Sequence, residues 1–202
     1  MARSIVDFLA FSARLKSELR HSWLTDGRQE SVAEHSWQMA VFALVAHAYL
    51  EEPVDILRTL KMVVVHDLME AEAGDVPFFA DPTLRREKLL REREAAERIR
   101  ERLGDPVGVE IFELFEEYEA GHTREAKFVK ALDNLEVQLQ HNLADFATWQ
   151  PIEYELVYTK MDRHCAHDAF LQALCTVIKA DAEQKMISAD VDTDAVRTRA
   201  GS

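Results

Sequence analysis

The pair His66-Asp67 is the part of this sequence with the clearest capacity for chemistry. It ends the apolar run 62–65, and Glu70 and Asp75 follow, so that a histidine and three carboxylates lie within ten residues. Ionisable groups beside a core-like segment are costly to bury unless they are paired or bind a cation. We therefore predict that a divalent metal ion compensates them.

Two polar residues on other predicted helices could complete such a site. His35 lies early in one helix, and Asp133 flanks the apolar stripe of another. Each has an ordinary alternative: either histidine could be hydrogen-bonded in the core, and Asp133 could pair with Lys130 one turn earlier. The order H, HD, D, with Glu and Asp four and nine residues after the second histidine, is more specific than its parts.

Glu70 and Asp75 lie near the expected end of the helix that carries the His66-Asp67 pair. Glu70 is one turn from both residues of the pair, and Gly74 lets the chain turn so that Asp75 can fold back. A solvated helix end is the alternative, but the helix dipole disfavours negative charge there. The pattern favours a positive group nearby.

Arg20 and Arg28 precede the second predicted helix in a loop-like region. An arginine side chain can make bidentate contacts to a phosphate group. Because arginines near a helix start are common, neither residue alone identifies a phosphate site.

The elements that must position these side chains are predicted to be helices. Glycine and proline are scarce and β-branched alternation is nearly absent, which favours an all-α fold. We predict helices over residues 4–19, 31–50, 53–74, 82–103, 107–119 and 123–145, and a longer helical region after Pro151. The Arg/Glu-rich face of 82–103 is expected to be exposed to solvent rather than to bind a ligand. Residues 1–187 are expected to form a single domain and 188–202 a flexible tail.

Composition limits the partners of this chain. Its 202 residues carry a formal net charge of −13, which argues against broad binding to nucleic acids or anionic membranes but not against a small phosphorylated ligand. No stretch approaches the roughly 20 apolar residues that a membrane span needs. Cys165 and Cys175 lack CxxC spacing, and a cytoplasmic location fits best.

These residues together give the chain a resemblance to the HD-domain metal-dependent phosphohydrolases. It looks most like the branch that contains the bacterial 5′-deoxynucleotidases and the eukaryotic HD-domain-containing protein 2. The matching stretches are residues 28–35, 65–70 with 74–77, and 125–133, and the likeness extends over about residues 5–180. The resemblance implies an HD-domain helical bundle with a metal site between core helices.

The resemblance also implies roles for individual residues. It makes His35, His66, Asp67 and Asp133 the metal ligands, Glu70 and Asp75 acid/base residues, and Arg20 a phosphate contact. In some relatives Glu70, Asp75 and the carbonyl of Val76 would bind a second metal ion. The deoxynucleotidases have Trp directly after the arginine, whereas this chain has His21 there and Trp23 two residues later, so Trp23 is the candidate substrate contact.

The activity that the resemblance implies is hydrolysis of (deoxy)nucleoside 5′-monophosphates to nucleoside and phosphate, by a homodimer. Two imidazoles and two carboxylates suit Mn²⁺, Fe²⁺, Co²⁺ or Zn²⁺, and Mg²⁺ suits a more oxygen-rich second site. One alternative is another HD enzyme that cleaves guanosine tetraphosphate or cyclic nucleotides. The guanosine tetraphosphate hydrolases usually have Glu-Asp after the HD pair, whereas Ala71 follows Glu70 here. The other alternative is a non-catalytic nucleotide-binding module, which would be marked by a missing ligand.

Overall fold

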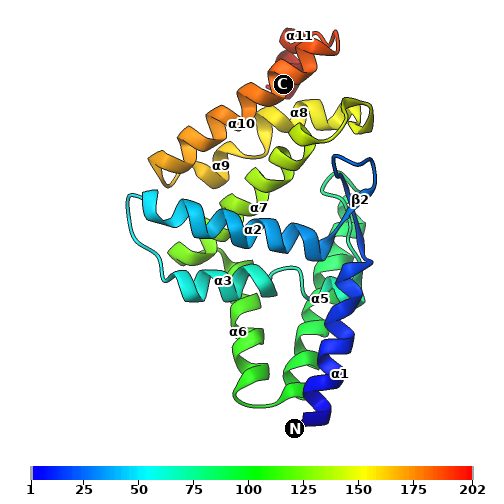
Figure 1. Cartoon of the computed structure of the whole chain (residues 1–202), viewed down its shortest axis with the longest axis vertical. Helices are drawn as coiled ribbons and strands as arrows, with labels where there is room; N and C mark the ends of the chain where they lie inside the picture. Colours follow the sequence, from blue (N-terminus) through cyan, green and yellow to red (C-terminus); the bar gives the residue numbers. More distant parts are fainter. Residues whose placement is uncertain (1, 202) are drawn as a thin grey trace.

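A computed structural model describes residues 2–201, which form a helical bundle with one small β-hairpin (Figure 1). The helices are α1 (Ala2–Ser12), α2 (Val32–Ala46), α3 (Ile56–Val65), α4 (Glu70–Ala73), α5 (Pro82–Leu103), α6 (Val107–Ala120), α7 (Arg124–Leu143), α8 (Pro151–Thr159), α9 (Asp162–Cys165), α10 (Ala169–Ser188) and α11 (Thr193–Ala200). Short 3₁₀ turns cover Ala13–Lys16, His47–Tyr49 and Phe146–Thr148. The predicted all-α class is confirmed.

The hairpin was not predicted, and the expected helix over residues 4–19 ends instead at Ser12. Strand β1 (Leu19–Trp23) pairs antiparallel with β2 (Gln29–Ser31), and the chain turns at Gly27, whose φ of 86° suits glycine. The buried residues of the two strands, Ser22, Glu30 and Ser31, are all polar, and Ser22 lies 3.3 Å from Nε2 of His141 on α7. The hairpin therefore lacks the apolar alternation by which strands are found in a sequence.

Helices α2, α3 and α7 form the centre of the molecule. Figure 1 shows α2 lying across the middle, and both α3 and α7 pack against it. Helix α2 begins with a capping box, as predicted: the Ser31 Oγ accepts from the Glu34 N–H, and the Ser31 N–H donates to the Glu34 carboxylate at 2.9 Å. Large apolar side chains from the three helices, including Met39, Met62 and Leu132, are fully buried between them.

The predicted helix from Pro53 to Gly74 is divided in the structure. It begins at Ile56 with Asp55 as its N-cap, ends at Val65, and resumes as the single turn of α4. Gly74 ends α4 with a φ of 76°, so the glycine occupies the terminal position that the sequence indicated. His66 keeps helical backbone angles, and after it the hydrogen bonds tighten to three-residue spacing, as from the Leu68 N–H to the Val65 carbonyl at 3.0 Å, so residues 66–69 form a turn between α3 and α4.

The C-terminal region also differs from the expected flexible tail, because α11 packs against α8. Val196 on α11 is buried, and Asp192 caps the helix through the Ala195 N–H at 3.0 Å. Arg197 pairs with Glu183 at 2.8 Å, which joins α11 to α10. The composition of the segment is polar, but one buried valine and these pairs are enough to dock it.

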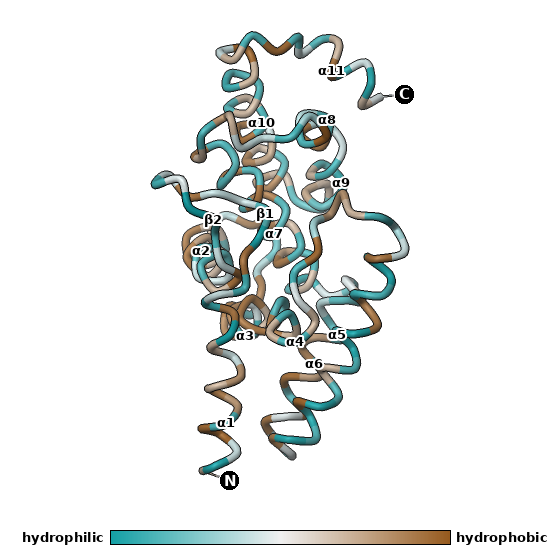
Figure 2. Tube along the Cα trace, turned by 90° about the vertical axis from the view of Figure 1, so that its right-hand side faces the viewer, coloured by the Kyte–Doolittle hydropathy of each residue, from teal (hydrophilic) through white to brown (hydrophobic). Residues whose placement is uncertain are grey.

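Helix α5 carries the long charged sequence that was expected to face solvent. Figure 2 shows extended hydrophilic stretches along it, and its buried face packs against α6 through Ala95, Ala96 and Ile99. Across residues 2–201, none of the helices is both long and apolar enough to cross a membrane.

Candidate metal centre and its cavity

The four predicted metal ligands come together from three parts of the chain. His35 lies on the first turn of α2, the pair His66 and Asp67 lies where α3 ends, and Asp133 lies on α7. Asp67 Oδ2 is 3.2 Å from His66 Nε2 and 3.8 Å from His35 Nε2. Asp133 Oδ1 is 3.3 Å from His35 Nε2. One ligand atom each from His35, His66 and Asp133 lie within 4.8 Å of one another, so a single ion could reach all of them.

The two histidines are oriented as metal-binding histidines are. His35 Nδ1 lies 2.5 Å from Glu136 Oε2, and His66 Nδ1 lies 2.7 Å from the Val63 carbonyl oxygen. Each Nδ1 is therefore placed to donate a proton to these oxygens, which leaves Nε2 as the ring atom that faces a metal ion and that would give up any proton when the ion binds. Both Nε2 atoms are buried and have no hydrogen-bond partner. A divalent cation would satisfy these two nitrogens, so the residues present fit the ion that the sequence predicts.

The carboxylates of this centre attract positive charge. Burial and Arg20 oppose protonation of His35, but Glu136 and Asp133 outweigh both and raise the pKa of His35 to about 10. Burial disfavours the charged form of Asp67, but His66 and Arg20 hold its pKa well below the usual value. Both effects show that the centre stabilises a cation among buried anions.

The carboxylate of Glu136 is expected to tune the metal affinity. Replacing Glu136 by glutamine keeps the size of the side chain but removes the negative charge behind the His35 ring. We expect metal affinity to fall about 10- to 100-fold, as for other groups that orient a ligating histidine. Competition with a chromophoric chelator measures this change, and Glu125→Gln on the same helix is the matched control. Equal affinity of the two variants would contradict the role of Glu136.

Arg20 lies beside the predicted ligands, whereas Arg28 does not. Arg20 Nη1 donates to Asp67 Oδ2 at 3.0 Å, and Arg20 Nε is 3.6 Å from Glu30 Oε2. Burial opposes the charge of Arg20, but Asp67 and nearby carboxylates raise the pKa of its guanidinium. Arg28 is exposed and pairs with Glu34. The structure thus places Arg20, which the resemblance singled out, beside the predicted ligands, and places Arg28 away from them.

The predicted acid/base residues lie next to the metal centre and meet a lysine from α5. Lys88 Nζ is 2.5 Å from Glu70 Oε1, 3.4 Å from Glu92 and 3.9 Å from Asp75. Burial and the nearby Asp67 raise the pKa of Glu70 well above its usual value, so Glu70 can hold a proton. The prediction that this face of α5 is only a solvated surface is therefore wrong around Lys88.

A cavity of about 400 Å³ opens above these residues. Its lining includes Arg20, Asp67, Asp133, Glu70, Asp75 and Val76 of the predicted set, together with Lys88, Tyr118, His21, Phe79 and residues of α7, α8 and α9. His35 and His66 lie beneath its floor, with side chains that are fully buried. The volume is within the usual range of small-molecule sites.

Trp23, the predicted substrate contact, does not line this cavity. Its ring packs edge-on against His21, with ring centroids 4.8 Å apart, and His21 in turn contacts Phe79 at 5.0 Å. His21 Nε2 lies 3.3 Å from Glu153 Oε1. The side chain that faces the cavity is therefore His21, and Trp23 supports it from behind.

Comparisons with known proteins agree with this geometry. The chain is 39% identical over 141 residues to the 5′-deoxynucleotidase HDDC2 of Bos taurus, covering 69% of this chain and 67% of that protein. It is 30% identical to the Mus musculus protein of the same name over 93% of both. A solved structure described as a predicted metal-dependent phosphohydrolase from Magnetospirillum magnetotacticum MS-1 superposes with a TM-score of 0.78 at 30% identity, covering 94% of this chain and 95% of that one. A profile of the HD domain matches residues 12–174, and the chain therefore belongs to the HD domain family.

Proposed function

We propose that this protein is a metal-dependent phosphomonoesterase that hydrolyses (deoxy)nucleoside 5′-monophosphates to nucleoside and phosphate. The observation that carries the proposal is the pair of unsatisfied imidazole nitrogens beside Asp67 and Asp133, directly beneath a cavity that Arg20 lines. The 5′-deoxynucleotidases among its relatives support the substrate class.

The ligands favour Mn²⁺, Fe²⁺, Co²⁺ or Zn²⁺ at the His/Asp centre, and His35, His66, Asp67 and Asp133 would hold the ion. When bound, such an ion lowers the pKa of a water molecule and neutralises charge on a phosphate oxygen. If a second ion such as Mg²⁺ binds, as the resemblance implies for some relatives, Glu70, Asp75 and the carbonyl oxygen of Val76 would hold it.

The surrounding side chains supply the rest of the chemistry. The guanidinium of Arg20 binds the phosphate and stabilises negative charge on its equatorial oxygens as the P–O bond breaks. Glu70 or Asp75 donates a proton to the leaving 5′ oxygen or orients the attacking water. Lys88 holds Glu70 in place through its 2.5 Å contact.

A panel of ribo- and deoxyribonucleoside 5′-monophosphates tests this proposal. The purified protein is assayed with Mn²⁺, Co²⁺ or Mg²⁺, and free phosphate is measured. We expect phosphate release that depends on added metal and stops when EDTA is present. No release from any monophosphate under any of these conditions would reject the proposal.

We further infer that the protein is a cytoplasmic homodimer. Trp37, Val41, Leu44 and Val45 form one face of α2 and are between 37% and 65% exposed, which is typical of a surface covered by a second copy. Both cysteines are free thiols, which fits a reducing compartment. Cell fractionation tests the cytoplasmic location.

Placing a charge on this face is expected to separate the dimer. Trp37→Asp should sediment as a monomer at micromolar concentration, because an aspartate at a covered apolar interface has no partner. Leu90→Asp, at an exposed position of α5, is the control. A wild-type protein that sediments as a monomer would contradict the inference.

A further inference from the structure

The cavity has a cationic region that the proposed reaction does not use. Four basic side chains that line it, Arg85, Lys130, Lys160 and Arg163, have no carboxylate oxygen within 4.0 Å in the part of the chain that the structure describes. Arg20 and Lys88, in the same cavity, are both paired with carboxylates. The chain has 37 acidic and 24 basic residues, so a shortage of carboxylates does not explain the difference.

Aromatic rings hold three of these cations in place. Lys160 Nζ lies 4.8 Å from the Phe78 ring, and Arg85 lies 5.2 Å from the same ring. Lys130 Nζ lies 4.2 Å from the Tyr118 ring. A cation–π contact orients a cation without neutralising it. These three side chains therefore keep their full charge available to an anion in the cavity.

Lys160 has the clearest need of an anion, and the exposed Arg163 lies three residues after it. Lys160 follows the last turn of α8 and is partly buried, and burial lowers the pKa of its ammonium group; Asp133 opposes this effect, and Arg20 and Arg163 add to it. Keeping an unpaired ammonium away from water is costly, and an anionic ligand would offset that cost. Arg163 Nε donates to His164 Nε2 at 3.0 Å, which fixes its guanidinium while its terminal nitrogens remain available.

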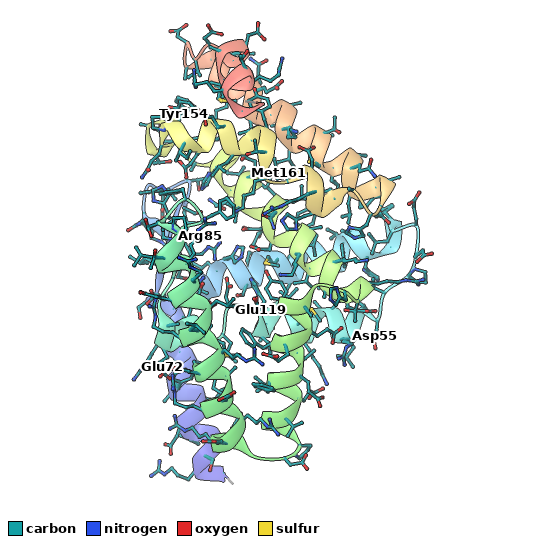
Figure 3. All side chains as sticks on the ribbon, turned by 180° about the vertical axis from the view of Figure 1, so that it is seen from behind. Asp55, Glu72, Arg85, Glu119, Tyr154 and Met161 are labelled. Carbon is teal, nitrogen blue, oxygen red and sulfur yellow. The ribbon has the colours of Figure 1, made fainter. Side chains whose placement is uncertain are left out.

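Lys160 and Arg163 lie on a different wall from the groups that would hold the reacting phosphate, whereas Lys130 and Arg85 lie at its edge, three residues before Asp133 on α7 and three residues before Lys88 on α5. The metal ligands, Arg20 and Lys88 belong to α2, α3, α7, β1 and α5, whereas Lys160 and Arg163 belong to the α8–α9 region. Figure 3 shows Arg85 at the end of α5 that is nearest to α8 and to Met161. The second phosphate of a 5′-diphosphate is bonded to the reacting phosphate and would remain beside Arg20. A phosphate elsewhere on the nucleoside can reach the second wall.

We propose that Arg85, Lys130, Lys160 and Arg163 form a second phosphate subsite, and that the enzyme prefers nucleoside 3′,5′-bisphosphates. This proposal rests on the proposed function and specifies its substrate class. Water attacks the 5′ phosphorus, the bond from phosphorus to the 5′ oxygen breaks, and that oxygen takes up a proton. The products are a nucleoside 3′-monophosphate and inorganic phosphate, with the 3′ phosphate held at the subsite.

The test compares the 5′-monophosphate, 5′-diphosphate and 3′,5′-bisphosphate of one deoxynucleoside. We expect kcat/KM for the bisphosphate to exceed that for the monophosphate by at least about tenfold at low salt, mainly through a lower KM, with the 5′ phosphate released. Lys160→Met and, separately, the more exposed Arg163→Met should reduce this ratio at least about fivefold. Lys127→Met, an exposed lysine of α7 that does not line the cavity, should keep the wild-type ratio.

The proposed subsite would be overturned if the wild-type ratio of kcat/KM for the bisphosphate to kcat/KM for the monophosphate were near one. It would also be overturned if the 5′-diphosphate were preferred as strongly as the bisphosphate, or if the ratio were unchanged in both variants. Calorimetric dissociation constants for the monophosphate and bisphosphate, measured with EDTA so that no turnover occurs, give a second readout. If the protein hydrolyses no nucleotide, the proposed function fails. The ratio of the two dissociation constants, and its change in the Lys160 and Arg163 variants, then still decide whether the subsite exists.

Discussion

Replacing Asp67 by alanine is expected to abolish both metal binding and phosphate release. Asp67 Oδ2 lies 3.2 Å from His66 Nε2 and 3.0 Å from Arg20 Nη1, so one oxygen joins the candidate metal centre to the arginine that we propose binds the phosphate. Alanine removes a ligand and leaves Arg20 without its nearest anion. We expect kcat/KM to fall at least about 10³-fold, comparable to the loss of a principal catalytic group.

The measurement combines metal content by mass spectrometry with the phosphate-release assay. Circular dichroism and a thermal melt check that the helices remain, since the variant must be folded for the result to count. Glu72→Ala is the matched control, because Glu72 is an acidic residue of α4 that does not line the cavity. A folded Asp67→Ala protein with full activity would refute the metal centre as the site of hydrolysis.

Replacing Arg20 by methionine is expected to lower kcat about 10²- to 10³-fold while the metal remains bound. Methionine keeps much of the side-chain length but removes the charge and the N–H donors that would bind the phosphate. None of the four predicted metal ligands changes, so metal content should stay near that of the wild type. Loss of activity with metal retained distinguishes the binding of phosphate from the binding of the ion.

Arg28→Met is the matched control for Arg20→Met. Both arginines belong to the hairpin region, but Arg28 is exposed and pairs with Glu34 outside the cavity. We expect the control to keep wild-type kcat and to lose only a small amount of helix-start stabilisation, since exposed ion pairs contribute little. An equal fall in kcat for the two variants would mean that Arg20 contributes only its positive charge to the protein and makes no specific contact with the phosphate.

The sequence was sufficient to predict the residues that surround the metal centre. An unusual density of ionisable groups behind the apolar run 62–65 indicated His66, Asp67 and Glu70, and the order of motifs added His35 and Asp133. Such predictions are possible because buried charge is rare, so that few explanations account for its presence. The structure brings all of these residues to one place, although their roles in catalysis stay predictions.

Other parts of the site depend on tertiary contacts that no local pattern reveals. Lys88 lies in a helix whose other charged side chains are mostly exposed, and only packing against α4 turns it towards Glu70. Glu136 is one turn from Asp133 and resembles an ordinary helical glutamate until His35 is placed beside it. Lys160 follows a short helix whose position depends on the fold of the whole C-terminal region.

The predicted metal ligands come from three separate elements, α2, the end of α3 and α7, and this arrangement has a consequence for folding. The predicted ligands come from three segments that are far apart in sequence, at residue 35, residues 66–67 and residue 133, so an unfolded chain cannot hold an ion with all four. A bound ion is therefore a reversible cross-link between the central helices. Each tenfold rise in free metal above the dissociation constant adds about 1.4 kcal/mol to the free energy of unfolding. Metal supply would thereby control how long the protein survives proteolysis as well as how fast it works.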